Sequence, residues 1–228
     1  MQINTDTQGV KTNGASRWMV WFSIEGDLRF LSHRDVMNLC ERASTRADLP
    51  VAFSKGFNPR PKISLLLPRP VGVASQCELL IIRFEQAFQD ARWLEQFSKQ
   101  FPPGAKILRA EPLPDKGQIW VKSVTYQLFL TDNESKAVSQ HLAVIKSNKD
   151  ATTLIKNEQT NDDKKIERYI LDMDVVENAL TFTIAGNPRT TPPGPDKVLK
   201  AVGFANPSEV ISRLTKTKLL YEISKETL

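Results

Sequence analysis

The sequence has few of the residues that hold metals or build redox centres. Its 228 residues include two cysteines, Cys40 and Cys77, and two histidines, His33 and His141, none of them closely spaced. Zinc and iron–sulfur sites need several such ligands, usually at short spacings. We therefore expect no metal site and no cofactor held by this chain alone.

Long apolar runs are also absent, and no stretch approaches the roughly 20 residues of a membrane-spanning helix. Residues 1–16 are polar and lack the apolar centre of a secretory signal, which predicts a flexible tail. These absences favour a protein of the cytoplasm with no membrane partner. Structural disulfides are rare in that compartment, and Cys40 falls on the apolar face of an expected helix, which predicts a buried thiol.

Acidic residues are missing from one long segment. No Asp or Glu occurs from Leu49 to Cys77, whereas Lys55, Arg60, Lys62 and Arg69 all do, and these four charges nearly equal the net charge of +5. A surface of one sign attracts phosphates and carboxylates. The segment is therefore the main candidate for a binding site.

Glycine and proline interrupt the same segment, which reads FSKGFNPRPKISLLLPRPVGV from Phe53 to Val73. Proline fixes φ, and glycine permits conformations closed to other residues, so the pattern predicts a shaped loop. A shaped loop that carries Lys55, Arg60 and Lys62 suits an anion, because little conformational entropy remains to be lost on binding. Phe57 offers a stacking face and Asn58 an amide for a base edge. The alternative is a proline-rich crossover with solvated cations.

Hydrophobic periodicity predicts an α+β protein. Ser32 and Asp35 have capping-box spacing at the start of a helix that is expected to end near Ala47. Strands are expected at 17–24, 51–53, 63–67, 78–84 and 106–113, and a second helix at 90–101. The order β-α-β-β-α-β is the ferredoxin-like arrangement.

The second half is expected to repeat this order. Strands are expected at 123–130, 151–156, 165–171, 180–185 and 218–223, with helices at 134–146 and from about Asp196 or Ser208 to Leu214. Residues 157–164 are polar and predict an exposed turn. We expect two ferredoxin-like (βαββαβ) halves: a first domain at 17–116 that contains the basic loop, and a second domain at 117–228.

Arg29 and His33 form a second candidate cluster. A histidine in the first turn of a helix lies beside free N–H groups, which helps to hold an anion. General acid–base chemistry at His33 is a weak candidate, and a histidine hydrogen-bonded within the capping turn is the simpler interpretation. No glycine-rich nucleotide loop, serine-nucleophile elbow or HExxH helix occurs. The reaction, if there is one, stays open.

Several segments resemble a known bacterial family. These are GDLRFLSH from Gly26 to His33, FSKGFNP from Phe53 to Pro59, PKIS from Pro61 to Ser64, and PVGV from Pro70 to Val73. They are similar to the radical-SAM-linked domain of unknown function, which occurs alone beside a radical SAM protein or fused to its C-terminal end. The resemblance implies a radical SAM protein as partner. The chain lacks the three-cysteine motif of a radical SAM cluster.

The candidate ligand- or RNA-binding residues are Arg29, His33, Lys55, Phe57, Asn58, Arg60, Lys62 and Ser64. The leading hypothesis is an accessory module that binds tRNA or ribosomal RNA and works with the radical SAM partner. One alternative is a protein-interaction adaptor without a ligand site. Another is an RNA-modifying or RNA-cleaving enzyme, with His33 as acid–base and Arg29, Arg60 and Lys62 stabilising charge. Whether Arg69 and residues 186–195 belong to the site stays open.

Overall fold

The computed structural model describes residues 16–147, 169–188 and 191–224. The first half of the chain contains four strands and two helices, with a 3-10 turn before the first helix. These elements are β1 (Ser16–Ile24), η1 (Gly26–Phe30), α1 (His33–Arg46), β2 (Ile63–Leu65), β3 (Ala74–Phe84), α2 (Trp93–Ser98) and β4 (Ala105–Leu113). The order of strands and helices predicted for this half is confirmed.

The second half has the same order of elements. They are β5 (Ile119–Phe129), α3 (Asp132–Ser147), β6 (Ile170–Val176), β7 (Ala179–Ala185), α4 (Pro195–Ala201), η3 (Pro207–Glu209), η4 (Ile211–Arg213) and β8 (Leu214–Ile223). The strand expected at 151–156, the turn expected at 157–164 and most of the expected tail lie outside the described residues.

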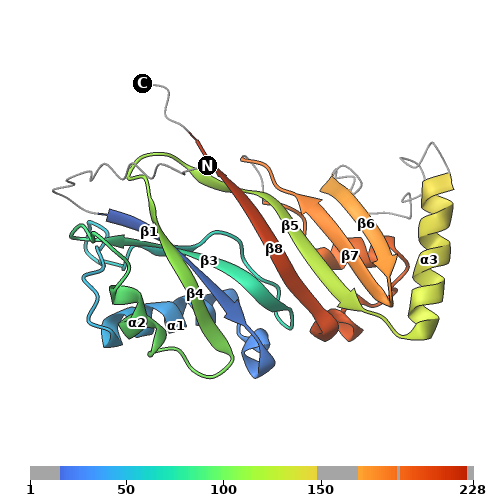
Figure 1. The fold of residues 1–228 in the computed structure, drawn as a ribbon, viewed down its shortest axis with the longest axis horizontal. Helices are drawn as coiled ribbons and strands as arrows, with labels where there is room; N and C mark the ends of the chain where they lie inside the picture. Colours follow the sequence, from blue (N-terminus) through green and yellow to red (C-terminus); the bar gives the residue numbers. More distant parts are fainter. Residues whose placement is uncertain (1–15, 148–168, 189–190, 225–228) are drawn as a thin grey trace, which may run out of the picture.

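The eight strands of the described residues belong to one sheet (Figure 1). The order along it is β4-β1-β3-β8-β5-β7-β6, and β2 pairs with β3 beside this path. The two halves meet where β3 and β8 run parallel, with Ala74 opposite Thr215 and Ser75 opposite Lys216. The other strand pairs of the sheet are antiparallel.

Helix α1 begins where its sequence predicts. Ser32 accepts a hydrogen bond from the Asp35 backbone N–H, and the Asp35 carboxylate accepts one from the Ser32 N–H, which completes a capping box. The buried side of the helix includes Val36, Cys40 and Ala43. A buried Cys40 confirms the interpretation of its helical position.

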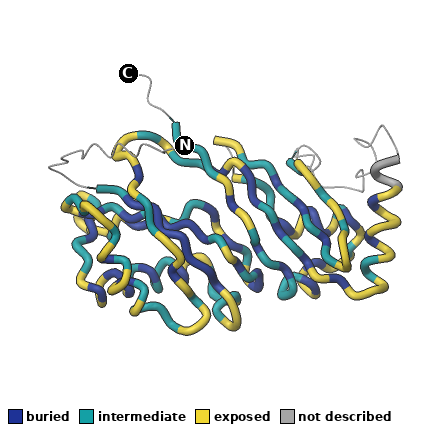
Figure 2. The backbone as a smooth tube through the Cα atoms, in the orientation of Figure 1, coloured by how far each residue is buried: buried dark blue, intermediate teal, exposed yellow. Residues whose placement is uncertain are grey.

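Two groups of buried residues stabilise the fold. One lies between α1, α2 and the sheet of the first half, and includes Trp18, Phe22, Phe84 and Phe97. The other contains residues from both halves, and in it the rings of Trp21 in β1 and Tyr221 in β8 lie 6.1 Å apart. Figure 2 shows buried residues along the central strands and exposed ones in the loops at the rim. The second group contains side chains from both halves, so the two halves pack against each other through one hydrophobic core.

Some element boundaries differ from the predictions. The helix expected at 90–101 is only six residues long, because the residues on both sides of it form bends and turns. Residues 51–53 make isolated bridges rather than a regular strand. The expected helix before the last strand is divided into α4 and two 3-10 turns, and β8 begins at Leu214 rather than at Lys218. β6 continues to Val176, beyond the expected end at 171, and residues 165–168 of the expected strand lie outside the described residues.

Among the described residues, no helix is long and apolar enough to cross a membrane. Both cysteines are free thiols, with Cys40 buried and Cys77 partly buried. Burial raises the pKa of the Cys40 thiol to about 12 and that of Cys77 to about 11. Both thiols are therefore protonated at neutral pH.

Candidate nucleic-acid interface

Residues 52–62 form a small hairpin, here called the basic hairpin. Phe53 bridges Pro61, the Ser54 N–H donates to the Arg60 carbonyl at 2.8 Å, and the Lys62 N–H donates to the Ala52 carbonyl at 2.7 Å. The Ser54 hydroxyl accepts a further bond from the Arg60 N–H at 3.0 Å. At the tip, Gly56 has φ +132°, which favours glycine. The segment thus has a defined shape with an open tip.

The base of the hairpin is hydrogen-bonded to the end of β3. The Ala52 N–H donates to the Arg83 carbonyl at 2.8 Å, and the Arg83 N–H donates to the Lys62 carbonyl at 3.0 Å. Val51 also bridges Phe84. These contacts connect the hairpin to the sheet and fix the direction in which it projects.

The side chains at the tip are open to solvent. Lys55, Asn58, Arg60 and Lys62 are exposed, and Phe57 is fully exposed. Within the described part of the chain, none of the three cations donates a side-chain hydrogen bond or forms an ion pair. These charges are therefore solvated and accessible to a ligand.

The surface also includes two arginines of the sheet. Ile63 pairs with Ile82, and both pack beneath the helices, so Lys62, Ser64 and Arg83 lie on the opposite side of the sheet. Arg17 is opposite Arg83 in the register between β1 and β3, and so shares this side. Arg60 is two residues before Lys62 on an extended segment. We call this group, Arg17, Arg60, Lys62 and Arg83, the basic face.

Neighbouring groups hold the two sheet arginines in place. Arg83 forms an ion pair of 3.6 Å with Asp115, and Arg17 donates to the carbonyls of Pro114, Asp115 and Gly117. The pKa of the Arg17 guanidinium is lowered, mainly because the group is partly buried. The positive charge of Arg83 lowers it further. Sequence reasoning missed both arginines, although each occupies an outward position in an alternating strand.

The structure separates Arg29 and His33 from the basic hairpin. Arg29 follows the Ile24 end of β1, which pairs with Ser75, whereas the hairpin lies by the Ser16 end, which pairs with Phe84. Nine residues of strand place these ends roughly 25 Å apart. The two candidate clusters are therefore at opposite ends of the sheet.

Arg29 has structural partners at its own end. Its Nε donates to the Gly26 carbonyl at 2.8 Å, and its Nη1 donates to the Ser212 carbonyl at 2.6 Å, which joins η1 to the second half. His33 is exposed as the first residue of α1. In the described ranges, no group of three or more His, Cys, Asp or Glu residues is placed to hold a metal ion.

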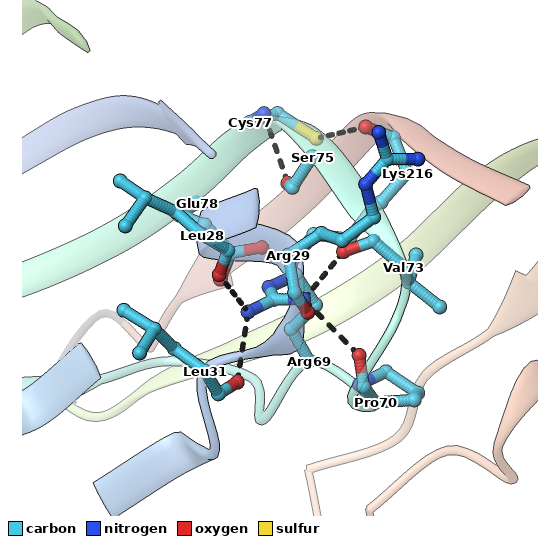
Figure 3. A network of polar contacts seen from close by, with 10 residues as sticks. All are labelled: Leu28, Arg29, Leu31, Arg69, Pro70, Val73, Ser75, Cys77, Glu78 and Lys216. Atoms are coloured by element: carbon cyan, nitrogen blue, oxygen red, sulfur yellow. Dashed lines mark hydrogen bonds and ion pairs between the residues drawn. The ribbon is translucent and has the colours of Figure 1, made fainter. Parts of the chain in front are cut away.

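Arg69 is buried, although it is one of the four cations that make the segment basic (Figure 3). Its guanidinium donates to the carbonyls of Leu28, Arg29, Leu31, Pro70 and Val73. Burial lowers the pKa of this guanidinium, and the nearby Glu78 opposes that effect. The role of Arg69 is thus to join the turn before β3 to η1, and its charge does not reach the basic face.

The proline-rich residues after β7 face the first half of the chain. Asn187, Pro188 and residues 191–195 line two adjoining clefts, of about 240 and 220 Å³, opposite Leu67 and Pro68. Gly186 is required at the start of this segment, because a Cβ there would lie 1.9 Å from the Val121 carbonyl oxygen. Residues 189 and 190 lie outside the described ranges.

Comparison with solved structures gives only distant likenesses. The acetolactate synthase small subunit from Thermotoga maritima is 11% identical, covers 93% of this chain and 99% of its own, and has a TM-score of 0.25. An unknown protein from Galdieria sulphuraria is 10% identical, covers 92% and 99% of the two chains, and has a TM-score of 0.28. At these scores neither likeness carries an argument about fold or function.

A search of curated proteins finds no match to this chain. Comparison with protein families gives a more specific result. A family model described as an uncharacterized protein conserved in bacteria matches residues 17–192, which is most of the chain and includes the basic hairpin and the residues that line the cleft of about 240 Å³. The chain belongs to this bacterial family, DUF2344.

Proposed function

We propose that this chain is an accessory module of a radical SAM protein and that it binds RNA, either tRNA or ribosomal RNA, through the basic hairpin. The observation that carries the proposal is the set of three exposed cations, Lys55, Arg60 and Lys62, on a hairpin anchored to the sheet. Lysine and arginine on a shaped surface neutralise phosphates with little loss of entropy. The radical SAM partner rests on the sequence resemblance.

The basic face extends this surface along the sheet. Arg83 and Arg17 lie beside Lys62, and Phe57 at the hairpin tip is fully exposed. Interleaved cations and aromatic rings are typical of surfaces that bind single-stranded nucleic acid, because the cations contact phosphates and the rings stack on bases. The same site thus offers contacts to both parts of a nucleotide.

We also infer that the chain consists of two ferredoxin-like halves, at 17–116 and 117–228. The support is the strand order, which is β4-β1-β3-β2 in the first half and β8-β5-β7-β6 in the second. In both halves the fourth strand is next to the first, and the third lies between the first and the second. This is the order expected of a βαββαβ unit.

A protein-interaction adaptor is the second candidate function. The exposed fractions of Phe53, at 50%, and of Phe57 favour it, because large apolar side chains in solvent often mark protein contacts. The enzyme alternative has less support. His33 lies at the opposite end of the sheet from Arg60 and Lys62, so a single chain does not assemble that catalytic group.

The test is RNA binding at two salt concentrations, with tRNA and ribosomal RNA fragments as probes. The native protein is compared with a Lys55→Ala, Arg60→Ala, Lys62→Ala variant. A Lys136→Ala, Lys200→Ala, Lys218→Ala variant is the matched control, because it loses the same charge from exposed positions in the second half. Circular dichroism checks that both variants are folded.

We expect the hairpin variant to lose most of its affinity. Its slope of log affinity against log salt should also flatten by roughly 2–3, which corresponds to three lost phosphate contacts. The control should bind almost as the native protein does. Equal losses in both variants would indicate binding by net charge alone. No binding by the native protein would reject the RNA proposal and favour the adaptor.

A further inference from the structure

The strands of the second half are covered by helices on one side. Inward side chains of β5 and β7 pack with α3 and α4 in one buried group, which includes Val124, Tyr126, Phe182, Val138 and Leu199. The residues between them along β5 and β7 point to the opposite side and are partly or fully exposed. Helices α1 and α2 belong to the other buried group, which contains residues of the first half. Among the described residues, the opposite side of these strands therefore has no helix packed on it.

The exposed side chains form rows across β8, β5, β7 and β6, which lie side by side in this order (Figure 1). In one row, successive cross-strand partners are Lys218, Thr125, Thr183 and Asp172. The hydroxyls of Thr125 and Thr183 lie 3.0 Å apart, which confirms that these side chains share one side of the sheet. Lys218 and Asp172 are exposed, and within the described ranges neither forms an ion pair. Three strand spacings, about 14 Å, separate them, so they cannot pair within one chain.

Two more rows continue this surface along the strands. They consist of Gln127, Thr181 and Asp174, and of Phe129, Ala179 and Val176. Phe129 and Val176 are 60% and 61% exposed, which gives the surface an apolar end. We call the three rows the open face. Its β8 edge carries the positive charge of Lys218, and its β6 edge carries the negative charge of Asp172.

The open face is complementary to itself. A two-fold rotation about an axis parallel to the strands, midway between β5 and β7, places β8 of one copy over β6 of a second copy. The rotation also places β5 over β7 and keeps each row over the same row. Lys218 then faces Asp172 of the second copy on both sides of the axis, while the two Phe129 rings lie side by side near the axis. Such an interface is isologous, and aligned sheets pack face to face in this way about 10 Å apart.

We propose that two copies of this chain form a symmetric dimer by packing their open faces together. This inference goes beyond the proposed function and does not depend on it, because no residue of the basic hairpin or the basic face belongs to the open face. Four strands of about seven residues offer roughly 450 Å² of sheet per copy. A standard interface buries about 800 Å² per partner. The dimer is therefore weak and reversible, with a dissociation constant in the micromolar range.

The experiment is sedimentation velocity of the full chain over a concentration series that reaches a few hundred micromolar. The native protein is compared with Lys218→Asp and with Asp172→Lys, first separately and then as an equimolar mixture of the two variants. Lys136→Asp, at an exposed position on α3, makes the same charge change as Lys218→Asp and is the control. Circular dichroism checks that each variant is folded.

We expect the native protein and the control to dimerise equally, and more weakly at high salt. Each charge reversal creates two contacts between like charges in its own dimer, so its dissociation constant should rise by at least about 10-fold. In the mixture, one variant has aspartate at both positions and the other has lysine. Both contacts between the two variants are again opposite in sign, so a mixed dimer should form.

Three results would overturn the inference. A native protein that stays monomeric throughout the series does so without any variant. A dimer that both reversals leave unchanged uses another surface. Loss of the dimer in both variants without recovery in the mixture means that Lys218 and Asp172 do not face each other. RNA binding per chain should be the same in monomer and dimer, including variants at these two positions, so the RNA proposal is decided separately.

Discussion

The Glu78 carboxylate in β3 and the Lys216 ammonium in β8 form an ion pair of 2.5 Å, with side chains that are 2% and 1% exposed. The pair connects the two halves of the sheet where they run parallel. The charge of the same carboxylate also opposes the burial that lowers the pKa of the Arg69 guanidinium, so Glu78 acts on two buried cations (Figure 3).

Glu78→Gln should destabilise the protein more than Lys216→Met. The glutamine variant leaves Lys216 and Arg69 buried without an anion, at a cost of about 3–5 kcal/mol in free energy of unfolding. In the methionine variant, Arg69 still compensates Glu78, so the loss is smaller. Urea unfolding of both variants measures the difference. The reverse order would show that Arg69 does not compensate the carboxylate.

Arg69→Lys should lower stability without a direct effect on RNA binding. Lysine cannot reproduce a planar guanidinium that donates to several carbonyls, and we expect a loss of about 2 kcal/mol in free energy of unfolding. Arg60→Lys is the control, because Arg60 is exposed and should leave stability unchanged. Thermal unfolding gives the comparison. A stable Arg69→Lys protein with weakened RNA binding would move Arg69 to the binding surface.

Stability should depend on pH through Glu134. Its carboxylate accepts hydrogen bonds from Arg213 at 2.6 and 2.9 Å, and chiefly for this reason the pKa of Glu134 falls to about 2. A lowered folded-state pKa stabilises the protein above the unfolded-state value of about 4.3, and this contribution is lost as the pH falls toward 2.

The corresponding test measures urea unfolding of the native protein and of Glu134→Gln from pH 6 to pH 2. The native protein should be more stable by about 1 kcal/mol at pH 6, a small value because both side chains are partly exposed. The difference should shrink below about pH 4.5. A difference that stays constant across this range would mean that the Glu134 charge does not stabilise the fold.

Asp115→Asn should strengthen RNA binding. The carboxylate forms an ion pair with Arg83, and its removal releases one cation of the basic face for a phosphate. We expect tighter binding at low salt and a salt slope that is steeper by about one. Asp172→Asn, at an exposed position on β6 in the second half, makes the same change in net charge and is the control. Equal gains in both variants would indicate a general charge effect.

Both thiols should resist thiol–disulfide exchange with an added aromatic disulfide in the folded protein. Burial raises the pKa of Cys40 to about 12 and of Cys77 to about 11, so the reactive thiolate is scarce at pH 8. Ellman's reagent should react slowly with the native protein and rapidly with both thiols in urea. Rapid reaction of one thiol before unfolding would show that its environment opens.

Local sequence patterns predicted the elements well but predicted the proposed binding surface only in part. The acid-free segment correctly identified Lys55, Arg60 and Lys62 as exposed cations, yet the same charge count included the buried Arg69. Counting charges cannot distinguish a cation in solvent from one that binds carbonyl groups inside the protein. Arg17 was overlooked because it belongs to an apolar strand far from the loop in sequence.

The sequence by itself determined where the strands and helices form, because periodicity, caps, glycine and proline act within a few residues. It also determined that one segment is basic. The tertiary structure alone decided that β3 pairs with β8, that Arg29 and His33 lie at the other end of the sheet from the hairpin, and that Trp120 borders a cleft beside β2. These relationships depend on contacts between residues far apart in the sequence, such as the pairing of Ser75 with Lys216, and no local pattern encodes such contacts.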